Sequence, residues 1–386
     1  MSEDLLFISA HLPVEKSRQA GHKTAWRNLV WLSERYRVHL IAFRSEGDRE
    51  EPLGGLHGLC ANLHVVDVTR NLRVRGLMGG PQLPLAVGAR NSAEVRRQVR
   101  EWSRRTRFSR VHVEWSQLGQ YLNEVDAVPE RTLYVHDVLT QWSSRRAVGW
   151  LRWLWNLEAD RTRRWERRVY GACTRLFVPS AKDGRLISED APELAGRIVV
   201  LPLHFDFYRP SSQRSYAGPI RLLFWGALGR PENAEAARWL VDHVVPRLRA
   251  AKIPFILVLA GSNPPQDIAA RRAPDVEVTG FITDPSEQFA RAHLAVLPLF
   301  QGAGVKVKVL ECLAAGLPVL TTGIGSEGIS ATPDDGLKVL APEAVEFARS
   351  IAQLAEDRAR LQRVAEAADA WGQRQGRDYR RVLVEA

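Results

Sequence analysis

The segment Leu299–Gly328, LFQGAGVKVKVLECLAAGLPVLTTGIGSEG, indicates the fold class of the chain. An apolar run ends at the start of this segment, a loop with two glycines follows, and the residue types from 305 to 315 predict a helix. Gly316 ends this helix and Pro318 prevents its continuation, so that a short apolar strand comes next. A strand, a glycine loop, a helix and a second strand in this order are typical of a parallel α/β sheet.

The same alternation continues over the rest of the chain. Apolar runs with the length of buried strands occur at residues 5–10, 37–43, 62–68, 110–115, 131–135, 174–179, 197–201, 220–225, 255–260, 276–278, 294–299 and 318–321. Segments with helical character occur at residues 25–35, 92–106, 142–170, 233–251, 285–292 and 305–315, and after 342. Residues 202–218 contain Pro, Ser and Gly but few apolar runs, as is typical of a domain boundary. The sequence therefore predicts two doubly wound, Rossmann-like domains, residues 1–205 and 206–386, that face a central cleft.

The composition fits two soluble domains. The chain has 386 residues, of which 45% are hydrophobic and 25% are charged, so it can bury two cores. Its three cysteines are isolated in the sequence, which argues against a disulfide framework or a structural zinc site and favours a reducing compartment. The acidic start of the chain does not resemble a signal peptide, and no apolar run is long enough to span a membrane. We therefore expect a cytoplasmic protein.

The net charge of +10 lies entirely in the first half of the chain. Residues 1–215 hold 34 Lys and Arg and 24 Asp and Glu, whereas residues 216–386 hold 20 of each kind. Such asymmetry indicates an anionic partner for the N-terminal half, which would be nucleic acid, a membrane surface or a phosphorylated substrate. A solvated, arginine-rich face would give the same counts, so both interpretations stay open.

The glycine loop 302–304 and the helix after it form a pattern suited to anion binding. Glycines let the backbone approach a phosphate closely, and the free N–H groups of the first helical turn, at 303–306, then point at it. Lys306 and Lys308 add positive charge at a helix end that favours anions, and a bound diphosphate would offset that charge. Glu311 could accept hydrogen bonds from ribose hydroxyls. The alternative is an ordinary strand–helix turn with solvated lysines.

This segment resembles the donor-site signature of retaining GT-B glycosyltransferases, especially glycosyltransferase family 4 (group 1). The similarity extends upstream to LLFWGALGRPENAEA at 222–236 and VTGFIT at 278–283, and to VVLPLHFDFYRP at 199–210, which is similar to the interdomain link of the family. Ala370-Trp371 is similar to the start of the last family helix, which crosses back to the N-terminal domain and would span about 371–386 here.

The chain departs from the family pattern at three points. The family commonly has two glutamates eight positions apart, of which Glu311 is the second, whereas Ala303 stands in place of the first, which usually contacts the donor sugar. Leu203-His204 replaces the Asn-Gly of the interdomain link. The basic residue that normally follows Arg230 is missing, and Lys306 or Lys308 would compensate for it.

The resemblance implies a nucleotide-sugar-dependent hexosyltransferase that works by front-face displacement. The donor β-phosphate takes the acceptor proton, and the protein positions the substrates and stabilises the leaving diphosphate. In this scheme Arg230, Lys306 and the amides of 303–306 stabilise the leaving group, Glu311 fixes the ribose and His136 contacts the sugar or the acceptor. These four side chains are the candidate catalytic residues. The candidate donor-binding residues are Gly21, Gly226, Gly280, Phe281, Gly302, Ala303, Gly304, Val305, Lys308 and Thr322. Because no metal-ligand constellation appears, we predict metal independence and no cofactor, with the nucleotide sugar as co-substrate.

Two features of the N-terminal half follow predicted strands. The loop 11–22 contains Gly21, and in GT-B enzymes a glycine in this loop lets a donor or acceptor phosphate approach. A solvated loop is the alternative. His136 and Asp137 follow the strand 131–135, at a strand end that opens into the cleft of such a fold. His136 is therefore a candidate site residue and Asp137 a candidate helix cap, unless His136 is merely adjacent to that cap.

Residues 141–171 contain eight arginines and five tryptophans, namely Trp142, Trp150, Trp153, Trp155 and Trp165. Trp and Arg together are typical of a membrane interface, where rings lie at the headgroup level and cations meet anionic phosphates. With the charge asymmetry, this pattern indicates peripheral contact with the anionic inner face of the plasma membrane and an acceptor such as a polyprenyl-diphosphate-linked glycan. The alternative is a core helix, because Trp at helical spacing usually packs inside.

The sequence thus predicts a retaining glycosyltransferase that moves a sugar from a nucleotide sugar to a glycan or lipid-linked acceptor in cell-surface polysaccharide biosynthesis. A nucleotide-sugar 2-epimerase of the same fold is the nearest alternative enzyme. A non-catalytic partner subunit, which Ala303 makes plausible, and a nucleic-acid-binding protein are alternatives of other classes. The last of these lacks any recognisable nucleic-acid-binding motif, so we expect no nucleic-acid partner.

Overall fold

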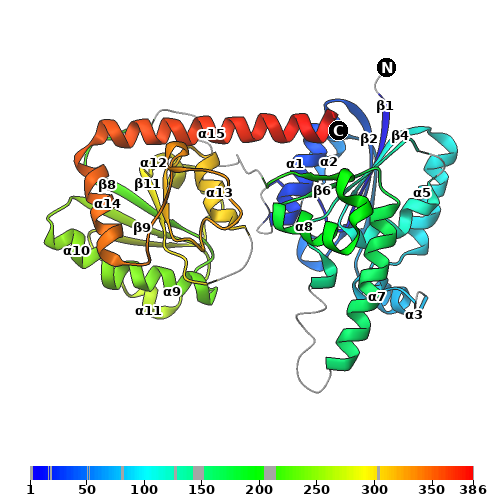
Figure 1. Cartoon of the computed structure of the whole chain (residues 1–386), viewed down its shortest axis with the longest axis horizontal. Helices are drawn as coiled ribbons and strands as arrows, with labels where there is room; N and C mark the ends of the chain where they lie inside the picture. The colour runs from blue at the N-terminus through cyan, green and yellow to red at the C-terminus, as the bar shows by residue number, and fades with distance from the viewer. Residues whose placement is uncertain are drawn as a thin grey trace. The chain divides into compact units, whose positions relative to one another are not determined.

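The computed structural model describes residues 3–15, 17, 20–49, 51, 53–79, 82–125, 128–141, 152–203, 214–301 and 305–385 (Figure 1). The chain divides into two compact units. Unit 1 comprises Met1–Pro202 and Arg380–Ala386, and unit 2 comprises Leu203–Tyr379. The predicted domain boundary, between residues 205 and 206, falls outside the described residues.

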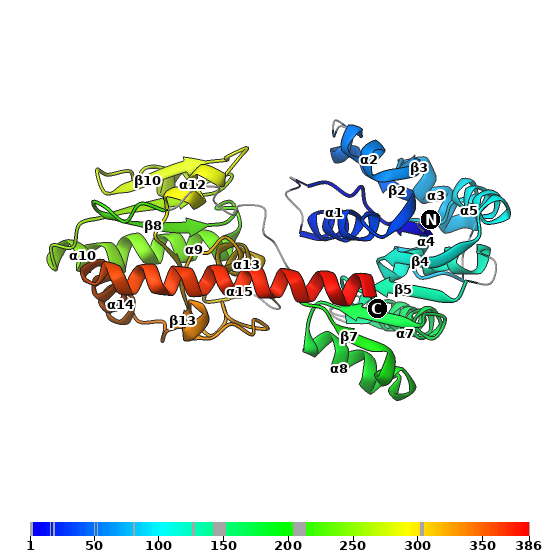
Figure 2. The same ribbon diagram turned by 90° about the horizontal axis from the view of Figure 1, so that it is seen from above.

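Unit 1 is built on a sheet with the strand order β3-β2-β1-β4-β5-β6-β7, in which every neighbouring pair is parallel. The labelled strands of this unit follow the same order in Figure 2. The strands are β1 (Glu3–Ser9), β2 (Tyr36–Arg44), β3 (Cys60–Asp67), β4 (Phe108–Glu114), β5 (Glu130–Tyr134), β6 (Arg175–Val178) and β7 (Ile198–Val200). The strand order reverses between β1 and β4, so the carboxyl ends of these two strands form the switch point at which such sheets bind ligands.

Burial explains the apolar runs of the sequence. Leu5, Leu6, Phe7 and Ile8 of the central strand β1 are all fully buried, because helices cover both faces of a doubly wound sheet. The helices of unit 1 are α1 (Ala20–Ser33), α2 (Gly54–Leu59), α3 (Arg70–Gly79), α4 (Leu85–Gly88), α5 (Ala93–Arg105), α7 (Arg152–Gly171) and α8 (Ala181–Asp190), with a 3₁₀ segment at Ser116–Glu124.

Unit 2 repeats the architecture with the parallel order β10-β9-β8-β11-β12-β13. Its strands are β8 (Ile220–Trp225), β9 (Phe255–Ala260), β10 (Val276–Gly280), β11 (Leu294–Leu297), β12 (Val319–Thr321) and β13 (Leu337–Val339). Its helices are α9 (Pro231–Trp239), α10 (Val245–Ala250), α11 (Gln266–Ala269), α12 (Ser286–Arg291), α13 (Val307–Ala314), α14 (Ala344–Glu356) and α15 (Arg358–Glu385). The switch point of this sheet lies between β8 and β11.

The end of α13 follows the predicted glycine stop. Gly316 has φ +67°, in the left-handed region that favours glycine, and its N–H donates to the carbonyl of Leu313 at 2.9 Å. The predicted α/β fold with two doubly wound parallel sheets is confirmed.

Helix α15 contributes to both units, with residues up to Tyr379 in unit 2 and the last residues in unit 1. In unit 1, Arg380 forms an ion pair with Glu34, and Arg35 donates to the carbonyl of Val384 at 3.0 Å. The helix begins at Arg358, well before the start predicted near residue 371. None of the described helices is long and apolar enough to cross a bilayer.

Candidate active site

The switch point of unit 2 is closely packed around Gly226, the first residue after β8. Gly226 has φ +149°, and a Cβ atom there would lie 3.0 Å from Nζ of Lys308 and 3.2 Å from Nδ2 of Asn233. A Cβ atom on the neighbouring Gly261 would overlap the carbonyl oxygen of Gly226. Both positions therefore require glycine, and the backbone of Gly226 lies beside a lysine ammonium group.

Lys308 reaches from α13 to this glycine. Its Nζ donates to Oδ1 of Asn233 and lies 5.8 Å from the centre of the Phe224 ring. Burial lowers the pKa of Lys308 to about 8, and Glu232 opposes this effect only in part. Among the described residues, no carboxylate lies within ion-pair distance of Nζ, so a partly buried cation here has an amide and a ring as partners. A buried cation of this kind favours an anionic ligand.

Glu311 lies one turn further along α13 and is 5% exposed. Its Oε2 accepts a hydrogen bond from Nε1 of Trp225, the last residue of β8, at 2.8 Å. Trp225 in turn packs edge-on against Phe289 at 5.2 Å between ring centres. The structure thus brings Glu311 and Lys308 together with Gly226 at one strand end.

The other predicted donor residues of unit 2 lie in different surroundings. Lys306 precedes α13, with Nζ 3.7 Å from Oε2 of Glu327, and Arg230 is exposed directly before α9. Gly280 has φ +71°, and Phe281 after it is 52% exposed.

Two more predicted residues have structural contacts, and three lie outside the described residues. Val305 packs against Gly328: a Cβ atom on Gly328 would lie 2.8 Å from Cγ2 of Val305. The buried hydroxyl of Thr322 donates to the carbonyl of Leu299. Gly302, Ala303 and Gly304 are not among the described residues.

The switch point of unit 1 holds a buried carboxylate. Glu114, the last residue of β4, is fully buried and accepts three hydrogen bonds. Nε2 of His136 lies 2.5 Å from Oε2, Nε2 of His112 lies 3.0 Å from Oε1, and Nδ2 of Asn28 donates to Oε1 at 2.7 Å. Burial acts to raise the pKa of Glu114, but the hydrogen bonds from His112 and His136 outweigh it and lower the pKa to about 2.

His136 also belongs to a stack of aromatic rings. The His136 ring lies nearly parallel to the Trp115 ring, with 3.7 Å between ring centres. The His11 ring packs edge-on against Trp115 and stacks on His22. Trp115 has φ +74°, in the left-handed region that a large side chain rarely adopts. A Cβ atom on Gly21 would lie 2.6 Å from Cζ2 of Trp115, so Gly21 is the residue that lets α1 pass this ring.

His11, in the loop after β1, and His22, at the start of α1, are both desolvated by burial. Burial, together with the neighbouring His22, lowers the pKa of His11 to about 3. His22 is 1% exposed, and burial also lowers its pKa. Its ring nitrogens have no hydrogen-bond partner among the described residues, and Oδ1 of Asp48 lies 3.8 Å from Nδ1. Both predicted site residues of unit 1, Gly21 and His136, thus lie against the same tryptophan.

Sequence analysis did not identify Glu114, Trp115 or His11 as site residues. The available signal was positional: Glu114 and Trp115 close a predicted apolar strand with a charged and a bulky residue, at the strand end that faces ligands in doubly wound sheets.

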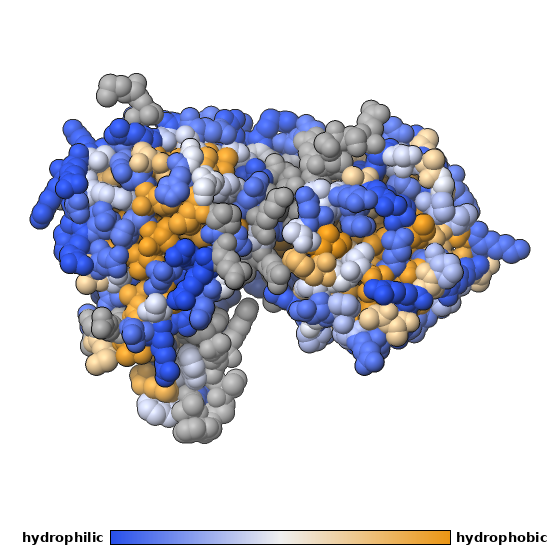
Figure 3. All heavy atoms as spheres, turned by 180° about the vertical axis from the view of Figure 1, so that it is seen from behind, coloured by the Kyte–Doolittle hydropathy of each residue, from blue (hydrophilic) through white to orange (hydrophobic). Residues whose placement is uncertain are grey.

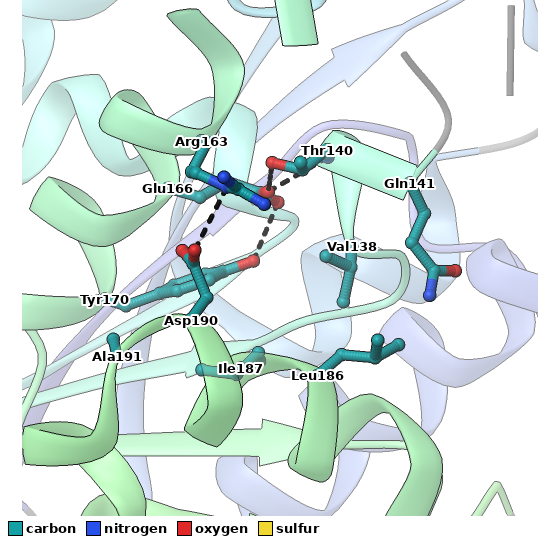
Figure 4. A pocket seen from close by; sticks show the side chains of 10 residues that line it. All are labelled: Val138, Thr140, Gln141, Arg163, Glu166, Tyr170, Leu186, Ile187, Asp190 and Ala191. Carbon is teal, nitrogen blue, oxygen red and sulfur yellow. Dashed lines mark hydrogen bonds and ion pairs between the residues drawn. The ribbon is translucent and has the colours of Figure 1, made fainter. Parts of the chain in front are cut away.

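A cavity of about 300 Å³ lies near the residues that follow His136 (Figure 4). Glu166 of α7 is buried beside it and accepts hydrogen bonds from the N–H groups of Leu139 at 2.7 Å and Thr140 at 3.0 Å and from the hydroxyl of Tyr170 at 2.7 Å. Burial raises the pKa of Glu166. Glu166 therefore binds the amides that Asp137 was expected to cap. The lining residues are Val138, Thr140, Gln141, Arg163, Glu166, Tyr170, Leu186, Ile187, Asp190 and Ala191.

The predicted membrane-facing tryptophans divide into different environments. Trp153 is 63% exposed, whereas Trp165 is 8% exposed and packs in the core with Val169 and Tyr170. The membrane prediction is therefore wrong for Trp165, because the helical spacing turns this ring toward the sheet. Trp142 and Trp150 lie outside the described residues.

In the part of the chain that the structure describes, no three His, Cys, Asp or Glu side chains are grouped so that they could hold a metal ion. Metal independence stays a prediction.

Comparison with known proteins finds a family model that matches part of unit 2. Residues 219–357 match the family model of the glycosyl transferases group 1. An uncharacterized 44.6 kDa protein in the cps region of Klebsiella pneumoniae is 26% identical over 190 residues. That alignment spans 46% of this chain and 48% of the relative, about half the length of each.

Solved glycosyltransferases share the fold over the whole chain. HepE of Anabaena, solved in complex with UDP and glucose, is 12% identical with a TM-score of 0.60, and the alignment covers 98% of both chains. WaaG, a glycosyltransferase involved in lipopolysaccharide biosynthesis, is 16% identical with a TM-score of 0.61 over 99% of this chain and 100% of WaaG. The sucrose-phosphate synthase of Thermosynechococcus elongatus is 16% identical with a TM-score of 0.58 over 100% of both chains.

These findings confirm the predicted GT-B fold. Within unit 2, residues 219–357 are similar to the glycosyl transferases group 1 family.

Proposed function

We propose that this chain is a retaining glycosyltransferase that moves a sugar from a nucleotide sugar to a glycan or lipid-linked acceptor in cell-surface polysaccharide biosynthesis. The family domain, the complexes of HepE with UDP and glucose, and the position of the Klebsiella pneumoniae relative in a cps region support this proposal. The observation that carries it is the partly buried ammonium group of Lys308, which lies beside the backbone of Gly226 with no carboxylate within ion-pair distance among the described residues.

The donor diphosphate would lie over Gly226, in contact with Lys308. A diphosphate supplies the negative charge that this buried ammonium group lacks among the described residues, and a glycine lets phosphate oxygens approach the backbone. The N–H groups at the start of α13 add dipole stabilisation for the same anion. Glu311, which accepts a hydrogen bond from Trp225, would also accept hydrogen bonds from the ribose. Lys308 is thus the better candidate for the missing basic residue than Lys306, whose ammonium group faces Glu327.

The reaction we propose is a front-face displacement at the anomeric carbon. The bond between C1 and the β-phosphate oxygen breaks, a bond between the acceptor oxygen and C1 forms on the same face, and the acceptor proton passes to the β-phosphate. Lys308, Lys306 and Arg230 stabilise the leaving diphosphate, and His136 contacts the sugar or the acceptor. This chemistry needs neither a metal ion nor a cofactor.

We further propose that the acceptor is embedded in an anionic membrane. Exposed apolar side chains gather on α3, on α4 and at the start of α7. We name them the α3–α7 surface, which comprises Val74, Met78, Leu85, Trp153, Leu154 and Leu157. The α7 helix contacts the chain after α3, because Glu158 accepts from the N–H of Leu85 at 2.5 Å and Arg161 donates to the carbonyl of Gln82 at 2.9 Å. Apolar and strongly polar side chains lie together at the end of unit 1 that extends downward in Figure 3. Exposed arginines beside exposed apolar side chains suit a headgroup layer.

A donor screen tests the proposed function. UDP-, GDP-, ADP- and TDP-hexoses are added to the full chain, and the melting temperature and the release of nucleoside diphosphate are measured. We expect at least one nucleotide sugar to raise the melting temperature and to be turned over, with the anomeric configuration of the donor retained in the product. Interconversion at C2 without transfer would indicate an epimerase, and an inverted product would exclude front-face displacement. No response to any nucleotide sugar would overturn the proposal.

A further inference from the structure

We propose that Glu114 is a positioning residue for His136. Its buried carboxylate fixes the imidazole with the Nε2 proton turned inward, so that Nδ1 is the ring nitrogen left for a sugar or acceptor hydroxyl. The part of this inference that concerns substrate rests on the proposed function, whereas the part that concerns the ring does not.

The proton positions follow from the charge of Glu114. Hydrogen bonds from His112 and His136 keep the pKa of Glu114 low in spite of its complete burial, so this group is an ionised carboxylate, which can only accept hydrogen bonds. Both histidine nitrogens beside it, Nε2 of His136 and Nε2 of His112, must therefore carry protons.

The rest of the network agrees with this assignment. With its proton on Nε2, His112 can accept at Nδ1 from the hydroxyl of Thr132, 2.8 Å away, and Thr132 in turn accepts from Nε of Arg110 at 3.2 Å. Oε1 of Glu114 binds His112 and Asn28, and Oε2 binds His136. One carboxylate oxygen thus binds structural donors, and the other binds the candidate site residue. A buried carboxylate needs such donors, and each one also restricts where the carboxylate can point.

A second contact fixes the plane of the His136 ring. The ring lies 3.7 Å from the Trp115 ring at an interplanar angle of 15°. The N–H of Trp115 donates to the carbonyl of Tyr134 at 3.1 Å, and Gly21 packs against the far edge of the indole. Hydrogen bond and stacking together leave the imidazole one orientation. A carboxylate behind a histidine fixes its tautomer and orientation in catalytic triads by the same physical means.

Other buried glutamates of unit 1 have different partners. Glu158 accepts from a backbone N–H and Glu166 from two, so these residues fix the chain rather than an imidazole. Glu114 instead accepts from side chains at the switch point of the sheet. This position and these partners distinguish a positioning residue from a structural one.

The first test uses the ligand-free protein. Long-range ¹H–¹⁵N spectra of ¹⁵N-histidine-labelled protein report which ring nitrogen carries the proton, and His136→Asn assigns the signals. We expect His136 to be protonated at Nε2 in the parent and in Glu158→Gln. In Glu114→Gln the amide can donate to Nε2, so we expect the signals to shift toward the Nδ1-protonated tautomer. Identical His136 signals in the parent and in Glu114→Gln would overturn the proposal.

The second test measures turnover of the nucleotide sugar that the donor screen identifies. Misplacement of a reacting group by about 1 Å lowers rates by about 100-fold, so Glu114→Gln should lower kcat by about that factor with little change in the KM for the donor. Glu158→Gln should behave like the parent. Glu114→Asp, which keeps the charge, should retain part of the activity and covers the case in which Glu114→Gln does not fold. Unchanged kcat in folded Glu114→Gln would refute the positioning role. If the parent turns over no nucleotide sugar, the proposed function fails, and the spectra still decide the arrangement of Glu114 and His136.

Discussion

Replacement of Lys308 by methionine should weaken nucleoside diphosphate binding and at the same time stabilise the free protein. The two effects have opposite signs because the ammonium group is partly buried and, among the described residues, has no carboxylate within ion-pair distance. A ligand-binding lysine of this kind stores a desolvation cost that the ligand relieves. A lysine with a purely structural role would lose stability on the same replacement.

The magnitudes follow from the pKa of Lys308. Burial lowers it from 10.5 to about 8, so that keeping the group charged at neutral pH costs on the order of 3 kcal/mol. The hydrogen bond to Asn233 offsets about 1 kcal/mol of this cost. Lys308→Met should therefore raise stability by about 1 kcal/mol or more, which is about 2–4 °C in melting temperature for a unit of this size. Loss of a charged hydrogen bond to the diphosphate should cost about 1.5–3 kcal/mol, or roughly 10- to 150-fold in Kd.

The pH dependence has a defined sign. The folded-state pKa is below the unfolded value, so between pH 8 and 10.5 the unfolded chain holds a proton that the folded chain has lost, and stability rises with pH in this window. A bound diphosphate favours the ammonium form, so binding should take up a proton, and affinity should fall as the pH rises above about 8.

Calorimetry with the nucleoside diphosphate of the best donor, in buffers of different ionisation enthalpy, measures both the affinity and the proton uptake. Lys338→Met is the matched control, because Lys338 lies in the same unit and donates to Ser350 at 3.0 Å. Unchanged affinity in Lys308→Met, or a fall in its melting temperature larger than in the control, would refute this assignment.

Three further predictions concern the donor, the metal and the membrane. Glu311→Gln should weaken binding of the nucleoside diphosphate by about 1.5–3 kcal/mol but leave binding of its dideoxyribose analogue nearly unaffected. Equal losses of affinity for both ligands would exclude a ribose contact. Turnover should survive EDTA, and complete loss that manganese or magnesium restores would show a metal requirement. Trp153→Ala combined with Leu157→Ala should reduce co-sedimentation with anionic liposomes at every salt concentration, whereas Arg164→Glu should reduce it mainly at low salt, where each basic group contributes about 1 kcal/mol. Equal sedimentation of parent and variants, or none, would remove the membrane from the proposed function.

The spacing of apolar residues and the glycines and prolines that end helices were sufficient to predict the fold. The apolar runs around Phe7 and Phe224 are near-continuous because their strands are buried on both faces, and the stop at Gly316 depends on a local backbone conformation. Strand β13 was missed because the charged Lys338 interrupts its short apolar run, and α3 because arginines alternate with its apolar residues. Such elements form through contacts with distant parts of the chain, which local patterns do not contain.

The candidate site was predictable where it depends on a local motif. Lys308 and Glu311 share one helix, so their spacing already placed them together. Choosing Lys308 over Lys306 required the position of Asn233, which is distant in sequence. Glu114 and Trp115 were not predicted as site residues, because their role depends on His136, which comes from another strand. The burial of Trp165 likewise depends on which face of α7 meets the sheet.

The division of α15 between the units has a consequence for synthesis of the chain on the ribosome. Unit 1 includes Arg380–Ala386, and Arg380 and Val384 bind Glu34 and Arg35 at the other end of the sequence. The first two hundred residues therefore emerge as an incomplete unit, which gains its last segment only after all of unit 2 has been translated. During that interval the nascent unit 1 lacks these contacts. We therefore expect chaperones to bind unit 1 mainly at this stage of synthesis. A chain truncated after Tyr379 should leave unit 1, rather than unit 2, prone to aggregation.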